Sequence, residues 1–146
     1  MRKFPKIKGI DHVHVYVTDL EEAKAWYSEY LGFQPVDKFE SWNKGDGPLT
    51  MADDSGQVHI ALFKSKKKPS SAIAFGSSGE NFIAWLAFFE SKSLSINLQN
   101  HGLSWSIYFN DPYGNNHEIT TYDFDYVKRY KAVSYTHLTL PTICSV

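Results

Sequence analysis

The chain has 146 residues, of which 42% are hydrophobic and 21% are charged, as expected for one folded globular domain and not for a disordered segment. Its 15 Lys and Arg residues nearly balance its 16 Asp and Glu residues, and the net charge of −1 argues against nucleic acid or an anionic membrane as the main partner. No apolar run reaches the roughly 20 residues of a membrane span, and the first residues lack the apolar core of a signal peptide, so we expect a cytoplasmic protein.

Residues 10–17 predict the first strand, because the segment is rich in β-branched residues and alternates strictly in polarity. Successive side chains of a strand point to opposite faces. His12, His14 and Tyr16 therefore share one face, and the valines between them share the other. We expect the histidine face to line a polar cleft.

A helix is predicted directly after this strand, and Gly32 is expected to end it. Thr18 and Glu21 have the spacing of a capping box, in which a hydroxyl and a carboxylate satisfy free N–H groups of the first helical turn. Three more strands are predicted in this half of the chain, over 33–40, 49–52 and 58–64.

The segment from residue 64 to residue 79 is polar and is interpreted as a linker, and its lysines at 66–68 fit a solvated face better than an anion site. The pattern then restarts in the second half. Here we predict a strand over 81–88, a weaker helix over 91–100, a strand over 104–109, a turn over 110–114 and a last strand over 117–122.

The last segment, 133–146, contains no Asp, Glu, Lys or Arg and looks non-native beside the charge-rich stretch before it. We assign it no part in the fold or the function, and His137 and Cys144 are not site candidates. Cys144 is the only cysteine, which excludes an internal disulfide.

Three segments carry a family resemblance: IDHVHVYVTDLEEAKAWYSEYLGF, VHIALF and SIYFNDPYGNNHEITTYD. Together they resemble the vicinal oxygen chelate superfamily, which includes glyoxalase I, extradiol dioxygenases, fosfomycin-resistance proteins and bleomycin-binding proteins. The strongest markers are His12 with Asp19 seven positions later, and the DPxGN turn that precedes Glu118.

The resemblance implies an α+β fold in which two βαβββ modules, about 8–65 and 80–125, form a single domain over 1–132. Their curved mixed sheets would form a cleft for a metal or a ligand. Members commonly build each cleft from modules of two chains, so a homodimer is expected, with a small molecule as the other partner.

The resemblance also implies metal ligands, which fall on His12 of the first strand, His59 of the fourth and Glu118 of the last. Two histidines and one carboxylate suit Fe(II), which is favoured, and also Mn(II), Ni(II) or Zn(II). The fifth-strand ligand position falls on Phe82, or on Ile83 if the register shifts by one residue, and neither side chain can bind a metal. His59 has an alternative interpretation, in which it is not a metal ligand but the acid–base that handles the substrate proton.

The remaining site candidates follow the dioxygenase branch of the resemblance. Tyr108 lies ten residues before Glu118, and His101 lies seven before Tyr108 in the run HGLSWSIY, so both are expected to be catalytic. His14, Tyr16 and Phe82 are expected to contact the substrate.

Three classes of function remain open at this point. The first is a small metalloenzyme that acts on a catechol-like, vicinal-oxygen substrate. The second is a metal-free module that binds a drug or an aromatic ligand, as the bleomycin-binding relatives do. The third is a fosfomycin-type thiol transferase, which Phe82 disfavours.

Overall fold

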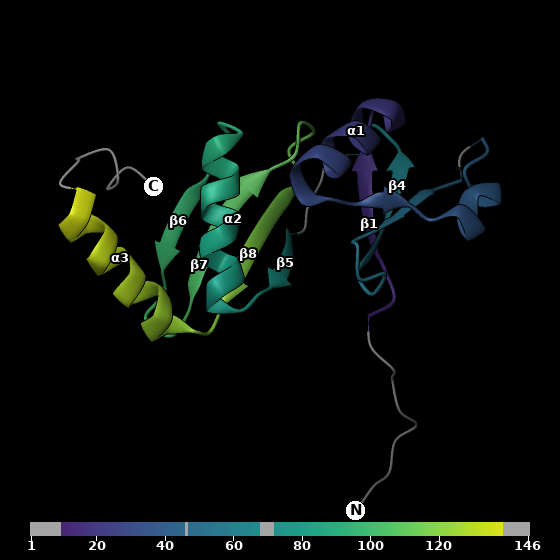
Figure 1. Cartoon of the computed structure of the whole chain (residues 1–146). Helices are drawn as coiled ribbons and strands as arrows, with labels where there is room; N and C mark the ends of the chain where they lie inside the picture. The colour runs from purple at the N-terminus through teal and green to yellow at the C-terminus, as the bar shows by residue number, and fades with distance from the viewer. Residues whose placement is uncertain (1–9, 46, 68–71, 139–146) are drawn as a thin grey trace, which may run out of the picture. The chain divides into compact units, whose positions relative to one another are not determined.

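The computed structural model describes residues 10–45, 47–67 and 72–138, and the tail beyond residue 138, with Cys144, lies outside them. The chain divides into two compact units, Met1–Lys68 and Pro69–Val146, and each is described by itself. Each unit holds a four-stranded mixed sheet and a helix that follows its first strand (Figure 1). The predicted α+β fold with two βαβββ modules is therefore confirmed.

The sheet of the first unit has the strand order β1-β4-β3-β2, in which β1 and β4 are parallel and the other neighbours are antiparallel. Its elements are β1 (Val13–Val17), α1 (Leu20–Leu31), β2 (Gln34–Pro35), the 3-10 helix η1 (Asp37–Trp42), β3 (Leu49–Ala52) and β4 (His59–Lys64).

The alternation predicted for the first strand is present in β1. Val15 and Val17 are buried in the core, whereas His14 is exposed on the opposite face. The register pairs His14 with Ala61 and Tyr16 with Phe63 of β4. Since paired residues point to the same face of a sheet, the histidine face of β1 continues onto β4.

Helix α1 starts one residue later than predicted, because Asp19 and not Thr18 is its N-cap. The Asp19 carboxylate accepts a hydrogen bond of 3.0 Å from the backbone N–H of Glu22. A carboxylate at this position also interacts favourably with the positive end of the helix dipole. Gly32 ends the helix in the left-handed conformation, with φ 71°, as the sequence predicts.

The strand predicted over 33–40 is wrong beyond its first residues. Only Gln34 and Pro35 pair with β3, and the chain then turns into η1. The N–H of Val36 still donates to the Thr50 carbonyl of β3 at 3.0 Å, and the N–H of Phe39 then donates back to the carbonyl of Val36 at 3.0 Å, which starts the 3-10 turn. This correction matters for function, because η1 supplies part of the cavity described below.

The second unit has the strand order β5-β8-β7-β6, with β5 parallel to β8. Its elements are β5 (Ala72–Gly76), α2 (Gly79–Ser91), β6 (Asn97–Asn100), β7 (Trp105–Asn110), β8 (Asn116–Thr121) and α3 (Phe124–Leu138). The predicted linker thus contains β5, the predicted strand over 81–88 is helix α2, and the predicted helix over 91–100 contains β6.

Helix α2 shows why the prediction failed here. Its run NFIAWLAF is apolar on most positions, and such a run fits a buried strand or a buried helix equally well. Phe82, Leu86 and Phe89 are buried at a helical spacing, and the Ser78 hydroxyl caps the helix by accepting from the N–H of Asn81 at 3.2 Å. No helix among the residues described in the structure is long and apolar enough to cross a membrane.

The turn between β7 and β8 is organised by the buried carboxylate of Asp111. Its Oδ1 accepts from the backbone N–H groups of Tyr113 and Asn115, both at 2.8 Å, and its Oδ2 accepts from the Asn115 side chain at 2.6 Å. Gly114 completes the turn with φ 83°. The DPxGN motif therefore stabilises the turn between β7 and β8, whether or not it also has a role in chemistry.

Substitution Asp111→Ala is expected to lower the free energy of unfolding by about 2–4 kcal/mol, because it removes the acceptor of three hydrogen bonds at a buried site. Urea denaturation measures this loss. The control Asp54→Ala removes an exposed carboxylate from another turn and should cost less than about 0.5 kcal/mol. Equal losses in the two variants would contradict the role given to Asp111.

Candidate functional site

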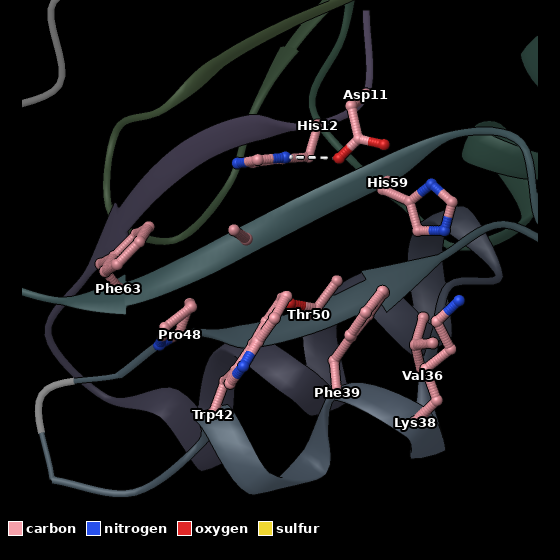
Figure 2. Close-up of a pocket in the computed structure, with 11 residues that line it drawn as sticks. Asp11, His12, Val36, Lys38, Phe39, Trp42, Pro48, Thr50, His59 and Phe63 are labelled. Atoms are coloured by element: carbon pink, nitrogen blue, oxygen red, sulfur yellow. Dashed lines mark hydrogen bonds and ion pairs between the residues drawn. The ribbon is translucent and has the colours of Figure 1, made fainter.

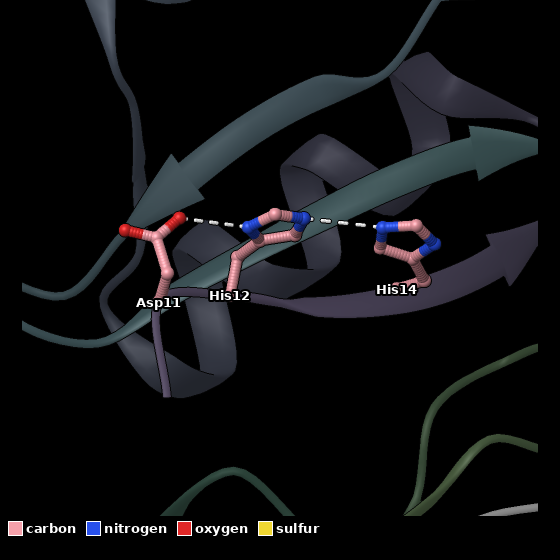
Figure 3. Close-up of polar contacts among 3 residues, drawn as sticks. All are labelled: Asp11, His12 and His14. Carbon is pink, nitrogen blue, oxygen red and sulfur yellow. Dashed lines mark hydrogen bonds and ion pairs between the residues drawn. The ribbon is translucent and has the colours of Figure 1, made fainter. Parts of the chain in front are cut away.

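The side chains of Asp11, His12 and His14 form a row along β1 and the two residues just before it (Figure 3). Nδ1 of His12 lies 2.8 Å from Oδ2 of Asp11, and Nε2 of His12 lies 3.1 Å from Nε2 of His14. Both nitrogens of the His12 ring are thus engaged. The side chain of His12 is still 42% exposed, so an incoming ligand or ion can reach it.

Asp11 was not predicted as a site residue, although it directly precedes His12. Its hydrogen bond with His12, together with the nearby His12, His59 and Lys38 side chains, lowers the pKa of Asp11 below its ordinary value. The carboxylate therefore remains ionised near neutral pH. It holds the His12 ring in one orientation, with Nδ1 turned away from His14.

A cavity of about 270 Å³ opens on this face of the first unit (Figure 2). His12 and His59, predicted from different strands, both line it. The full lining is Asp11, His12, Val36, Lys38, Phe39, Trp42, Pro48, Thr50, His59, Ala61 and Phe63. The cavity is mostly apolar, with its polar groups just before β1 and on η1, β3 and β4, which is the usual composition of a small-molecule site.

Two aromatic rings from η1 form one wall of this cavity. The rings of Phe39 and Trp42 stack with centroids 4.5 Å apart and planes at 9° to one another. Trp42 is 55% exposed, and the Lys38 ammonium lies 5.0 Å from the centre of the Phe39 ring. Sequence reasoning missed this wall, because it assigned residues 33–40 to a strand.

The other two predicted substrate contacts of the first unit lie on the same face of the sheet. The His14 ring is 4.7 Å from that of Phe63, and the Tyr16 ring is 6.1 Å from it. The Lys67 ammonium also lies 5.2 Å from the centre of the Tyr16 ring. His14 and Tyr16 do not line the cavity itself, so Phe63 is the side chain that links them to it.

In the second unit, Glu118 lies half-buried on β8. Its Oε2 accepts a hydrogen bond of 2.6 Å from the hydroxyl of Ser106, which is itself fully buried on β7. The register places Tyr108 directly opposite Glu118. Ser106 was not predicted, but its place two residues before Tyr108 puts it on the same face of β7.

His101 and Tyr108, both predicted to be catalytic, are in contact. Nε2 of His101 lies 2.9 Å from the hydroxyl oxygen of Tyr108, and the two rings meet edge to face. The hairpin pairs Tyr108 with Asn97 and His101 with Ser104, so the contact is made by two long side chains and not by paired positions. A phenol paired with an imidazole can pass a proton between them.

Phe82 does not have the place that the sequence predicts. It lies on α2 with 0% exposure and belongs to the core, so it is neither a strand residue nor a wall of the cavity. His12 precedes its helix cap, Asp19, by seven positions, and the same spacing before Ser78 leads to Ser71. Ser71 lies outside the described residues.

The three predicted metal ligands come from different units, His12 and His59 from the first and Glu118 from the second. Across the residues that the structure describes, no group of three or more His, Cys, Asp or Glu side chains is assembled to hold a metal ion. The ligand set therefore stays a prediction.

The sequence profile of the Glyoxalase/Bleomycin resistance protein/Dioxygenase superfamily matches residues 9–119. The chain belongs to this superfamily. The match covers both modules, from the residues before β1 into β8, and so includes every candidate site residue named above. A search of the curated proteins finds no significant match.

Several solved structures share the superfamily fold with this chain. An integron cassette protein from the mobile metagenome of a Halifax Harbour sewage outfall is 23% identical with a TM-score of 0.67, over 79% of this chain and 99% of its own. A lactoylglutathione lyase from Agrobacterium tumefaciens is 20% identical with a TM-score of 0.64, over 80% and 96%. A superfamily member from Sphaerobacter thermophilus is 18% identical with a TM-score of 0.64, over 79% and 98%. At these identities the likeness shows the fold alone.

Proposed function

We propose that this superfamily member is a small metalloenzyme that binds a flat, vicinal-oxygen molecule of the catechol type and acts on it with Fe(II) or a similar divalent ion. The observation that carries the proposal is that His12 and His59 line one cavity whose wall is the stacked pair Phe39 and Trp42. Imidazoles suit a divalent ion, and flat rings suit a flat ligand.

The donor chemistry of the predicted ligands fits a divalent ion. Nδ1 of His12 is hydrogen-bonded to the Asp11 carboxylate, and such a bond orients the ring of a histidine that binds a metal. Oε2 of Glu118 accepts a hydrogen bond from the Ser106 hydroxyl, and this bond orients the carboxylate in a similar way. His12, His59 and Glu118 would hold the ion, which would act as a Lewis acid on the two adjacent oxygens of the ligand.

The remaining residues would bind the ligand and handle its protons. Phe39, Trp42 and Phe63 offer flat apolar surface, and the Lys38 ammonium at the edge of the cavity favours an anionic oxygen. The Tyr108 hydroxyl donates toward a ligand oxygen while His101 holds or accepts its proton. If the ion does not engage His59, the His59 imidazole acts as the acid–base on the cavity side.

Metal retention tests this proposal. Protein stripped of metal and reconstituted anaerobically with Fe(II), Mn(II), Ni(II) or Zn(II) is expected to keep about one ion per chain after desalting. His12→Ala and Glu118→Gln are expected to lose it while circular dichroism stays unchanged, because neither side chain belongs to the buried core. Wild-type protein that retains none of the four metals would refute the enzyme proposal.

A metal-free ligand-binding module is the second candidate, because both ring nitrogens of His12 are already engaged by Asp11 and His14. Binding of 4-nitrocatechol, measured by calorimetry with and without metal, separates the two functions. The enzyme proposal expects tighter binding to the metal-loaded protein, whereas the module expects equal affinity.

Under both functions, Trp42→Ala is expected to weaken 4-nitrocatechol binding by about tenfold, the loss expected when one aromatic contact of about 1–1.5 kcal/mol is removed. Trp42 is largely exposed, so the variant should fold normally. The matched control Tyr122→Ala removes an exposed aromatic ring from the second unit and should leave the affinity unchanged. An unchanged affinity in Trp42→Ala would show that the η1 wall does not contact the ligand.

Two further properties are proposed from the superfamily alone. We infer that the chain forms a homodimer, which light scattering at several concentrations tests, and that it works in the cytoplasm on a small molecule.

A further inference from the structure

The row of side chains at β1 carries an inference about the metal that goes beyond the proposed ligand set and rests on the proposed function. Nε2 of His12 and Nε2 of His14 are 3.1 Å apart, with the two rings inclined by only 17°. Two nitrogens bound side by side to one ion, with bonds of about 2.0–2.1 Å, stand about 3 Å apart. The pair therefore has the spacing of two ligands of one ion, and a rotation of the two rings would turn both Nε2 atoms from one another toward the ion.

The orientation of His12 supports the same conclusion independently. Asp11 engages Nδ1 at 2.8 Å, which leaves Nε2 as the nitrogen that can bind a metal, and this nitrogen is the one directed at His14 (Figure 3). Asp11 and His14 both lie on the surface, so neither needs to leave a buried partner when an ion arrives. An incoming ion would displace the proton between the two Nε2 atoms, and His14 would then carry its proton on Nδ1, which solvent can deliver at this exposed position.

His14 adds a donor to the two predicted ligands of the first unit, because its ring contacts that of His12 directly. We propose that His14 is a metal ligand of this chain, so that His12 and His14 together bind the divalent ion as an adjacent pair on one strand. His14 thereby takes a different role from the substrate contact that the sequence predicts.

Zn(II) binding to the full-length protein tests this proposal, with affinity measured by competition against a chromophoric chelator. We expect His14→Ala and His12→Ala each to weaken Zn(II) by about tenfold or more, in line with the effect of disturbing a metal-ligand shell. His14→Phe, which suits an exposed strand position, should behave like His14→Ala and controls for a local strand defect. Asp54→Ala is the matched control and should stay within about twofold of wild type, because it removes an exposed oxygen donor from the turn between β3 and β4, away from the histidine pair.

A second readout identifies the nitrogens themselves. In long-range ¹H–¹⁵N spectra of the imidazole rings, saturating Zn(II) should shift the Nε2 resonances of both His12 and His14. Nδ1 of His12 should keep the shift of a protonated nitrogen, because it still donates to Asp11.

The outcomes separate this proposal from the proposed function. If His12→Ala loses Zn(II) but both His14 variants bind it as wild type does, the role of His14 is overturned and the proposed ligand set stands. If the His12 and His14 variants lose Zn(II) while His59→Ala and Glu118→Gln retain it, His14 is supported and the set that includes His59 and Glu118 is overturned. Wild-type protein that binds no Zn(II) overturns the role of His14.

Discussion

Truncation of Phe82 to alanine is expected to lower the free energy of unfolding by about 3–5 kcal/mol, the usual loss for a buried phenylalanine. Phe82 is fully buried on α2, and no part of its ring reaches solvent. Its removal leaves a cavity between the helix and the rest of the second unit. Urea or thermal denaturation followed by circular dichroism measures the loss.

The same variant decides between the two roles of this residue. A substrate contact on a strand, as the sequence predicts, would weaken ligand binding with little loss of stability. Loss of a core residue on α2 would lower stability and leave ligand binding unchanged. Phe82→Ala should therefore bind 4-nitrocatechol as wild type does, at a temperature where the variant is folded. Asn81→Ala, at an exposed position in the same turn, should cost less than about 0.5 kcal/mol. A loss as small as this in Phe82→Ala would refute the core assignment.

A pH-dependent loss of stability is expected from His117. This side chain is 1% exposed between the rings of Phe75 and Phe109, and burial lowers its pKa to about 4, although the Asp111 carboxylate nearby acts to raise it. The unfolded chain takes up a proton at this histidine near pH 6.5, whereas the folded chain does so only near pH 4. Stability should therefore fall as the pH drops through this range, by a total on the order of 3 kcal/mol.

The comparison variant is His117→Leu, which removes the titration and keeps an apolar group of similar size. The free energy of unfolding, measured by urea denaturation from pH 7 to pH 4, should fall less steeply in His117→Leu than in wild type. The difference between the two slopes isolates His117 from the other titrating groups. Identical slopes in wild type and His117→Leu would show that His117 titrates normally.

The first module could be predicted from the sequence in most of its parts, because its signals are local. The alternation of β1 follows from the period of a strand, and it places His12 and His14 on one face whatever the sheet order is. Gly32 ends α1 because its left-handed backbone favours a residue without a side chain. The sheet topology and the candidate site depend on residues far apart in the chain, so they were predicted from the family resemblance and not from local pattern.

The second module could not be predicted in the same way, because its central segment lacks a period. NFIAWLAF is apolar around the whole helix, so the pattern does not distinguish α2 from a buried strand. Strand β5, the five-residue run AIAFG, pairs in parallel with β8, a partner more than 40 residues away in the chain, which local pattern does not reveal. This error placed the fifth-strand position at Phe82 of α2, whereas the fifth strand is Ala72–Gly76.

The sequence by itself determined the superfamily and the α+β class, through a resemblance that spans most of the chain, and the shared face of His12 and His14, through the alternation of a strand. Only the tertiary structure decided what these residues contact. The pairing of Ser106 with Glu118 needs the register of β7 and β8, and the wall of Phe39 and Trp42 needs η1 to fold beside the sheet. Such contacts depend on which distant segments pack together, and the energy that selects that packing is spread over the whole core.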